Sequence, residues 1–359
     1  MRWIGALSSV CTAALLVVGA TPAAATPAIG APAGAHGPKW QLTPTGTDAR
    51  LRGLSVVDGR TAWAGGTGGT VLRTTDGGRT WASVGPPGAE ALQFRDIEAF
   101  DANTAVAMTI GNGPDSRIYS TTNGGRSWTE SFRNTDARAF YDCMAFFDRR
   151  NGLALSDPVD GKFRILSTTD GGKSWKLLPG DGMPAVQPKE FAFAASGQCL
   201  VTSGSRDAWI ATGGDAKARV FHSRDRGLTW TVSDTPLQSG ESAGVFSVAL
   251  RDSRNGIAIG GDYDPAKPTK DAVARTSDGG KTWTKAAKAP AGYRSGATYV
   301  PYLPFAILAV GPTGSDVSLD NGNHWFQFDA GSFDTVDCGR DASCWAAGEK
   351  GRIAKLTLR

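Results

Sequence analysis

Arginine, tyrosine and carboxylate side chains recur at corresponding places along this chain, each ahead of a repeated turn. When the segments are aligned by their turn residues, Arg52, Arg95, Asp142 and Glu190 fall at equivalent positions of four successive repeats. An arginine fork can hold a carboxylate through two parallel hydrogen bonds, so this set favours a binding site for a polar or acidic ligand. The same side chains could instead form ion pairs that solvate the mouth of a narrow channel. The ligand-binding candidates are Arg52, Arg95, Tyr141, Asp142, Lys189, Glu190, Glu241, Tyr293 and Arg294, with Phe333 beside them.

The sequence lacks the motifs of the common catalytic centres. It contains no G-x-S-x-G, no P-loop, no H-E-x-x-H and no cluster of Cys and His with metal-ligand spacing. After residue 25 the histidines are His36, His222 and His324 alone. The sequence therefore predicts neither a metal nor a cofactor, and it leaves tyrosine and carboxylate chemistry as the available catalytic option.

The candidates lie between copies of an eight-residue pattern, Ser/Thr-x-Asp-x-Gly-x-Thr/Ser-Trp, which occurs six times with small variations. The third residue can accept hydrogen bonds from N–H groups of its own turn, and the glycine allows a positive φ. The tryptophan begins the next strand and offers a large apolar face to a neighbouring sheet. We therefore interpret the pattern as a structural hairpin. Its third residues are Asp76, Asn123, Asp170, Asp225, Asp278 and Asp320.

The spacing of these hairpins predicts an all-β fold, a seven-bladed β-propeller with four-stranded blades. The third residues are 47, 47, 55, 53 and 42 positions apart, which suits four short antiparallel strands and their turns. After the last copy, residues 332–359 supply only three strands. Trp40, within Lys39–Leu42, matches the repeat tryptophan, so we expect an N-terminal strand to close the last blade and remove an exposed sheet edge. The predicted propeller spans residues 39–359.

The repeated pattern resembles the Asp-box, or BNR, repeat. A seven-bladed chain of such repeats is similar to the Ycf48/HCF136-like photosystem II assembly factors and their non-photosynthetic bacterial relatives, over almost the whole chain after residue 38. For the photosynthetic members the resemblance implies a non-enzymatic assembly or scaffolding role. We therefore expect a binding propeller that recognises a protein or a polar ligand on the face where the inner strands begin. Longer loops extend over that face at 156–158, 204–214 and 260–265.

A sialidase-like glycoside hydrolase is the enzymatic alternative, because Asp boxes also occur in sialidases and in xyloglucan-cleaving hydrolases. Tyr141 would then be the nucleophile, Glu190 its activating base and Asp142 the acid/base, with three arginines on the substrate carboxylate. Two features disagree with it. The sialidase Phe/Tyr-Arg-Ile-Pro motif belongs near the start of the domain, whereas residues 163–166 read FRIL, and sialidase propellers have six blades. A cofactor-using oxidoreductase is a weaker alternative, since the Gly-Asn-Gly at 111–113 precedes no helical pattern.

Four cysteines follow residue 25. Cys338 and Cys344 flank a short turn, where two antiparallel strands bring their Cβ atoms within bonding range, so we predict a disulfide between them. Cys143 and Cys199 either form a second disulfide or remain as two buried thiols.

The N-terminus predicts export. Residues 1–25 combine Arg2, an apolar stretch and three alanines at 23–25, which is typical of a cleaved signal peptide, and residues 26–38 read as a flexible leader. Removal of residues 1–25 takes away Arg2 alone and lowers the net charge from +4 to +3. Because basic and acidic residues are interspersed, we expect no nucleic-acid partner, and no stretch after the signal is apolar enough for a membrane span. The sequence predicts a monomer that is secreted or resides in the cell envelope.

Overall fold

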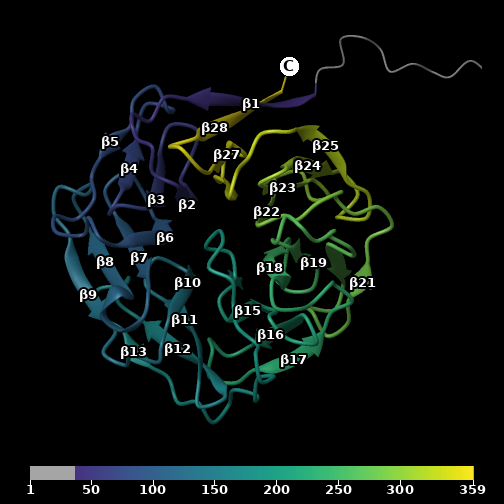
Figure 1. Ribbon diagram of the computed structural model, residues 1–359. Helices are drawn as coiled ribbons and strands as arrows, with labels where there is room; N and C mark the ends of the chain where they lie inside the picture. Colours follow the sequence, from purple (N-terminus) through teal and green to yellow (C-terminus); the bar gives the residue numbers. More distant parts are fainter. Residues whose placement is uncertain (1–36, 359) are drawn as a thin grey trace, which may run out of the picture. The chain divides into compact units, whose positions relative to one another are not determined.

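The computed structural model describes residues 37–358, which form seven antiparallel four-stranded sheets arranged in a ring (Figure 1). The predicted signal peptide and nearly all of the predicted leader lie outside the described residues. Within residues 37–358, the helical structure is confined to the single 3-10 turn Gly113–Asp115, and no helix is long and apolar enough to cross a membrane. The all-β, seven-bladed propeller predicted from the hairpin spacing is confirmed.

Each blade is a meander whose first strand lines the centre of the ring. Blade one contains β2 (Leu51–Val56), β3 (Ala62–Gly66), β4 (Val71–Thr74) and β5 (Ala82–Ser83). Blade two contains β6 (Gln93–Ala99), β7 (Ala105–Ile110), β8 (Arg117–Thr121) and β9 (Thr129–Arg133). Blade three contains β10 (Tyr141–Phe146), β11 (Gly152–Val159), β12 (Lys162–Thr168) and β13 (Lys176–Leu177). Blade four contains β14 (Leu200–Ser203), β15 (Asp207–Thr212), β16 (Arg219–Ser223) and β17 (Thr231–Asp234).

The remaining three blades complete the ring. Blade five contains β18 (Ala243–Leu250), β19 (Gly256–Asp262), β20 (Val273–Thr276) and β21 (Thr284–Lys285). Blade six contains β22 (Gly296–Tyr299), β23 (Ile307–Gly311), β24 (Gly314–Ser318) and β25 (Phe326–Asp329). Blade seven contains β26 (Thr335–Cys338), β27 (Cys344–Ala347), β28 (Ile353–Leu358) and, on its outer edge, β1 (Pro38–Thr43).

The N-terminal strand closes the ring, as predicted. In Figure 1 the purple strand β1 lies beside the yellow strand β28, and the two pair antiparallel with Trp40 opposite Leu356. The Trp40 side chain is buried against Phe328 and Phe333, and its indole N–H donates to the Ser315 hydroxyl of blade six at 2.9 Å. The first and last parts of the described chain are therefore joined by backbone pairing and by apolar contact.

The eight-residue repeats form hairpin turns between the third and fourth strands of their blades. In the first copy the Asp76 carboxylate accepts from the backbone N–H and the hydroxyl of Thr80, at 3.0 and 2.6 Å. The Thr74 hydroxyl accepts from the N–H of Gly78 at 2.9 Å. Gly78 has a φ of +83°, and a Cβ there would lie 2.8 Å from the indole of Trp345 in blade seven. The turn therefore requires glycine both for its backbone and for the close approach of the neighbouring blade.

Aromatic side chains fill the spaces between neighbouring blades. The repeat tryptophan Trp81 meets Trp345 edge to face at 5.8 Å, and Trp128 meets Trp63 in the same way at 6.2 Å. Trp128 also donates its indole N–H to the carbonyl of Val84 at 2.6 Å. Such contacts hold each blade against the one before it, since apolar burial and edge-to-face geometry both favour them.

Polar side chains bridge neighbouring inner strands, which do not form a continuous sheet with one another. In each case a carboxylate or hydroxyl of one blade accepts from a backbone N–H of the next, so buried donors near the channel are satisfied. The bonds run from Val56 N to Asp337, from Ala99 N to Ser55 and from Met144 N to Asp96, at 2.7, 2.9 and 2.6 Å.

Two disulfides are present. The predicted bond between Cys338 and Cys344 is confirmed, joining β26 to β27 within blade seven. Cys143 and Cys199 are also bonded, which decides between the two alternatives left by the sequence. This second bond joins β10 of blade three to the residue just before β14 of blade four. Two disulfides in one chain are typical of proteins from oxidising compartments.

We predict that Gly78→Val destabilises the protein by more than about 2 kcal/mol, because the side chain meets both an unfavourable φ and the Trp345 indole. The neighbouring Arg79→Ala, at an exposed position, should change stability by less than about 0.5 kcal/mol. Thermal unfolding of the two variants checks the difference. Equal melting temperatures would contradict the turn geometry.

The two disulfides should contribute unequally to stability. Cys143 and Cys199 are 56 residues apart, whereas Cys338 and Cys344 are 6 apart. Since a disulfide restricts the unfolded chain more when it closes a longer loop, removing the first by a double alanine substitution should cost roughly 4 kcal/mol and removing the second roughly 2 kcal/mol. Urea unfolding of the two double variants measures both losses. A larger loss for the Cys338–Cys344 pair would contradict the chain-entropy account.

Candidate functional site

Backbone bulges turn four side chains toward the centre of the ring at the start of the inner strands. The pairing register of the inner strand shifts by one residue in blades one, two, three and five, which leaves one residue unpaired in each. Such bulges redirect a side chain. The unpaired residues are Arg52, Arg95, Asp142 and Phe246, and all four line one cavity. Arg52, Arg95 and Asp142 therefore hold equivalent positions in the register of their blades.

Blade four departs from this pattern. Phe191 pairs with Gly213, and regular pairing resumes only at Cys199, so residues 192–198 leave the sheet. We call residues 192–198 the channel loop. In Figure 1 a teal loop projects into the middle of the ring beside β10, β15 and β18. In blades one, two, three and five a single residue is unpaired at this position. In blade four the channel loop takes its place and crosses the channel.

Residues 192–194 of the channel loop are held by side chains of blades two and three. Arg95 donates to the carbonyl of Ala194 at 2.6 Å, and Asp157 accepts from the N–H of Ala192 at 2.9 Å. These charge-assisted bonds satisfy backbone groups that would otherwise face the cavity unpaired.

Residues 196–198 of the channel loop form hydrogen bonds with blades five, six and seven. Gln198 donates to the carbonyl of Val336 at 2.8 Å and accepts from the N–H of Ala297 at 2.9 Å and from Ser247 at 3.1 Å. The Ser196 hydroxyl donates to the carbonyl of Ser295 at 2.8 Å. The loop is therefore bonded to five of the other six blades, and the Cys143–Cys199 disulfide adjoins its end.

The channel loop divides the channel into two cavities. One, at the end where the inner strands begin, has a volume of about 520 Å³ and includes Ala192–Ala195 in its lining. The other, at the end where the inner strands finish, has a volume of about 280 Å³ and includes Ser196–Gln198. We call them the arginine cavity and the acidic cavity, from the charged side chains that line each.

Three arginines line the arginine cavity, and two of them, Arg52 and Arg95, have donors that its carboxyl groups do not pair. Arg50 forms a two-bond contact with Asp334, at 2.8 and 2.7 Å, whereas Arg52 lies 3.6 Å from the same carboxylate. The Nε atoms of Arg52 and Arg95 are buried and have no hydrogen-bond partner among the residues that the structure describes. Burial, followed by the charges of Arg52 and Arg50, lowers the pKa of Arg95 to about 9. An anion entering this cavity would relieve the repulsion and satisfy the free donors.

Asp142 and Asp157 form a carboxyl pair in the wall of the arginine cavity. The two carboxyl groups lie in the same wall and interact electrostatically, and Asp142 is 1% exposed. Burial, followed by the charge of Asp157, raises the pKa of Asp142 well above its usual value, and burial raises the pKa of Asp157 to about 7. Because two carboxylates this close cannot both ionise easily, the pair keeps at least one proton at neutral pH.

Aromatic rings form the opposite wall. Phe193 of the channel loop stacks on Phe246 with ring centroids 3.8 Å apart, and Tyr293 meets Phe246 at 4.6 Å. Tyr263, from the predicted loop at 260–265, lies at the rim and is 53% exposed. The cavity therefore suits a ligand that carries both an anionic group and an apolar group.

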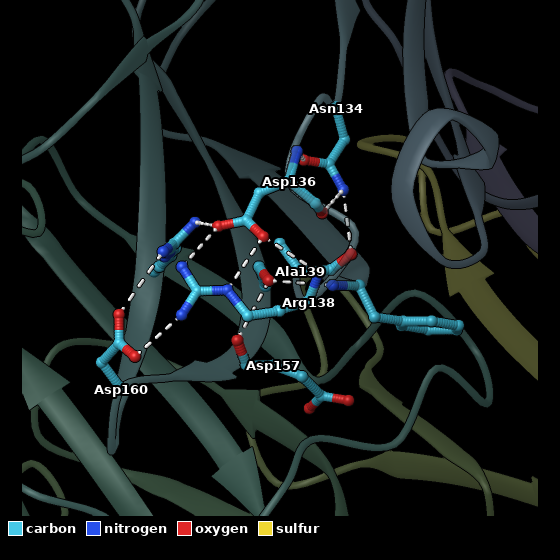
Figure 2. A network of polar contacts seen from close by, with 9 residues as sticks. Asn134, Asp136, Arg138, Ala139, Asp157 and Asp160 are labelled. Atoms are coloured by element: carbon cyan, nitrogen blue, oxygen red, sulfur yellow. Dashed lines mark hydrogen bonds and ion pairs between the residues drawn. The ribbon is translucent and has the colours of Figure 1, made fainter.

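An ion-pair network holds the rim on the side of blade three. Figure 2 shows Arg138 between Asp136 and Asp160. Arg164 joins the same two carboxylates, at 2.8 and 4.0 Å. The hydrogen bond from Arg138 is the largest cause that holds the pKa of Asp136 well below its usual value. The Asp157 carboxyl points away from this network, so it stays available to Asp142 and to the channel loop.

Five of the predicted residues do not line the arginine cavity, and three of these five are buried elsewhere. Glu190 is buried against Arg219, whose Nε donates to it at 2.9 Å, so it is not equivalent to Arg52 as the alignment predicted. Arg294 is fully buried and donates to Asp316 at 2.6 Å. The Tyr141 ring packs against Phe132 between blades two and three.

The other predicted residues are divided between the cavity and the surface. Tyr293 lines the cavity, and burial raises its pKa. Lys189 and Glu241 are exposed and lie outside the cavity lining. The structure therefore does not bring Tyr141, Glu190 and Asp142 together, as a sialidase-like set would require, and only Asp142 of these three lines the cavity.

Several cavity residues were absent from the sequence prediction. Asp334 occupies in blade seven the place that Arg52 occupies in blade one. Each lies three residues before the inner-strand residue that pairs with a tryptophan, which is Asp337 opposite Trp345 in blade seven and Ser55 opposite Trp63 in blade one. Aligning the two tryptophans would have found it. Arg50 lies two residues before Arg52 and carries no repeat signal. Phe193 and Phe246 were absent because the predicted set was chosen mainly from polar side chains.

The fold and the site define the class: a seven-bladed β-propeller whose channel is divided by a loop and whose larger cavity combines arginines, a carboxyl pair and aromatic rings. No protein-family profile matches the sequence, and no curated protein does.

Solved structures show the same fold. The chain is similar to Ycf48 bound to a D1 peptide, with a TM-score of 0.63 and 16% identity over 89% of this chain and 97% of that one. It is similar to Ycf48 from Cyanidioschyzon merolae, with a TM-score of 0.64 and 14% identity over 88% and 98%. The GH74 xyloglucanase from Xanthomonas campestris gives a TM-score of 0.62 and 14% identity over 89% of this chain and 53% of that one. At these identities the likeness shows the fold alone.

We predict that the stability of the Asp142→Asn variant, measured relative to that of the wild type, increases as pH rises. The unfolded chain releases the Asp142 proton near pH 4, whereas the raised pKa of the folded state retains it, so wild-type stability falls with rising pH between these two values by up to about 1.4 kcal/mol per pH unit. The amide can still donate to Asp157 and has no proton to lose. Urea unfolding at about pH 5 and pH 8 measures the change.

Asp160→Asn is the matched control, because the Asp160 side chain is 74% exposed. Its stability difference from wild type should hardly vary with pH. If the stability difference between Asp142→Asn and the wild type is the same at both pH values, the buried carboxyl pair does not share a proton.

Proposed function

We propose that this protein is a non-enzymatic binding or scaffolding propeller that holds a protein segment, or another ligand with an anionic and an apolar group, in the arginine cavity. One observation carries the proposal: the Nε donors of Arg52 and Arg95 are buried without hydrogen-bond partners among the described residues, in a cavity that stacked aromatic rings also line. Arginine forks bind carboxylates in two-bond geometry, and a dry aromatic wall favours an adjoining apolar group.

The solved Ycf48 structure that contains a D1 peptide supports a polypeptide as the ligand, since it shows that a propeller of this fold can bind one. We further propose that the eight-residue hairpins are Asp boxes of the BNR kind and that the chain is exported, acting as a monomer. The two disulfides favour an oxidising compartment.

We predict that an Arg52→Ala/Arg95→Ala double variant loses the partner that the wild-type protein captures from culture supernatant or cell envelope. Removing both guanidinium groups takes away the unpaired donors and leaves the Arg50–Asp334 contact in place. Capture should fall at least about tenfold, the size expected for one or two charged hydrogen bonds. The measurement is the amount of captured protein, with release of the wild-type complex by added salt as a second readout.

An Arg79→Ala/Arg126→Ala double variant is the control, because it removes two exposed arginines of the hairpin turns. It should capture as much partner as the wild-type protein does. Equal capture by the Arg52→Ala/Arg95→Ala variant would place binding elsewhere. Hydrolysis of xyloglucan or fluorogenic sialosides that Asp142→Asn abolishes would replace the binding role with an enzymatic one.

A further inference from the structure

The acidic cavity differs in charge from the arginine cavity. Three carboxyl groups line it, from Asp96, Glu98 and Asp337, and neither lysine nor arginine is among its lining residues. Its volume of about 280 Å³ is below the ~300–1,000 Å³ of small-molecule pockets, so it suits one long side chain better than a whole ligand. Among the described residues no group of His, Cys, Asp and Glu is arranged to hold a metal ion.

The carboxyl groups of this cavity have no positive partner. Asp96 and Asp337 each accept a backbone N–H, from Met144 and Val56. Glu98 forms no side-chain hydrogen bond or ion pair within the described part of the chain. Burial raises the pKa of Asp96 to about 8, and burial together with the charges of Asp96 and Asp337 raises the pKa of Glu98 well above its usual value. A cation placed here would stabilise the ionised carboxylates.

An exposed apolar surface adjoins this cavity. Tyr302, Leu303, Phe305 and Leu319 are 82%, 52%, 54% and 68% exposed, and we call these four residues the blade-six patch. They come from two neighbouring turns, the β22–β23 turn and the hairpin between β24 and β25. Grouped exposed apolar side chains of this size are typical of interaction sites.

The turn that carries the blade-six patch is internally bonded. Val300 and Ala306 are joined by a backbone hydrogen bond of 3.0 Å, and Leu303 bonds to both of them, at 3.1 and 2.9 Å. The carbonyl of Phe305 accepts from the N–H of Asn321 in the neighbouring hairpin at 2.9 Å. The apolar side chains are therefore presented on an ordered backbone, which lowers the entropic cost of binding.

Tyr299 connects the patch to the acidic cavity. It lines the cavity, and its hydroxyl donates to the side chain of Asn321 at 2.8 Å, two residues from Leu319. On the other side Leu250 lines the cavity, and the next residue, Arg251, lies over the ring of Phe305 at 5.5 Å. The apolar patch and the carboxyl groups thus belong to one continuous surface.

We propose that the blade-six patch and the acidic cavity form a second binding surface, for a protein segment in which apolar side chains adjoin a lysine or arginine. The apolar side chains lie on Leu303, Phe305 and Leu319, and the cationic side chain enters the cavity toward Glu98. Charge complementarity selects this partner over a bilayer, because the carboxyl groups line a cavity of about 280 Å³ that a single cationic side chain can enter and ionise, whereas anionic headgroups would oppose that ionisation. The surface is independent of the proposed function, since the channel loop separates it from the arginine cavity.

The test is a selection of random displayed peptides against the wild-type protein, followed by affinity measurements on variants. The enriched peptides should carry apolar residues beside a lysine or arginine. Leu303→Ser/Phe305→Ser and Glu98→Gln should each weaken their binding at least about tenfold. Leu177→Ser, at a leucine that is 55% exposed on β13, is the matched control and should leave binding unchanged. Arg52→Ala, which leaves the bond from Arg95 to the channel loop in place, should bind these peptides as the wild type does, so a loss of binding at the arginine cavity can be told apart from a loss at this surface.

The pH dependence supplies a readout that a merely structural role would not give. The titratable groups facing the cationic side chain are Asp96, Glu98, Asp337 and Tyr299, with Arg251 beyond the rim. Because the raised pKa values keep the carboxyl groups protonated in the empty cavity, affinity should rise between about pH 6 and pH 9. Glu98→Gln should flatten that rise, and thermal unfolding confirms that the variant folds.

Five results would overturn the proposal. Three of them come from the selection: enrichment of acidic peptides, enrichment of peptides that bind Leu303→Ser/Phe305→Ser as well as the wild type, and no enrichment of any peptide. Binding to vesicles of phosphatidylethanolamine and phosphatidylglycerol that this variant loses would assign the patch to a bilayer. Self-association that the variant abolishes would assign it to a second copy of the chain.

Discussion

The pairing of β1 with β28 is the interaction on which the rest of the structure depends. It closes the last sheet with residues from the start of the propeller, 310 positions away where Thr43 meets Ile353. The closure also assembles the arginine cavity, because Arg50 and Arg52 belong to the first blade and Asp334 to the last. An open stack of the same blades would leave a sheet edge exposed and would separate these charges.

Closing the ring creates a channel, and the channel loop determines what that channel can do. A channel lined by seven inner strands with single bulges would be continuous, with a similar environment at both ends. The channel loop instead places residues 192–198 across it, and the backbone and side chains of the loop are bonded to five blades. Arginines then line only one of the two cavities, and the carboxyl groups of the other cavity have no arginine or lysine beside them. The two ends therefore favour ligands of opposite charge.

The repeats made the fold predictable because each hairpin repeats the same local chemistry. Asp76 and Gly78 determine a turn through local contacts, and Trp81 marks the start of the fourth strand of the blade. The six turns predicted six blades, and the three strands after the last turn together with Trp40 predicted the seventh and its closure. The alignment assigned Arg52, Arg95 and Asp142 to equivalent positions because each lies 6 residues before the aspartate of the turn that follows its inner strand.

The site was predicted less well where a blade departs from the repeat. The channel loop lengthens blade four ahead of its inner strand, so alignment by turn residues assigned Glu190 to a position that residues 192–198 occupy. Arg294 was assigned to the cavity because it lies just before an inner strand, yet its side chain is paired with Asp316 on β24, the third strand of its own blade. Tyr141 lies one residue before the bulge, which turns Asp142 inward and leaves the ring between the blades. A change of one residue beside a bulge reverses the direction of a side chain.

The carboxyl pair and the arginines of the larger cavity are electrostatically linked. Arg95 favours ionisation of Asp142, and Asp142 in turn favours the charged form of Arg95. An anion bound to Arg95 would weaken that support, and its own charge would oppose ionisation of the pair, so the bound state favours a protonated Asp142. Asp157 also holds the channel loop through Ala192. The proton on the pair, the charge of the ligand and the position of the loop are therefore coupled through two neighbouring side chains, and this coupling follows from their burial in a common wall.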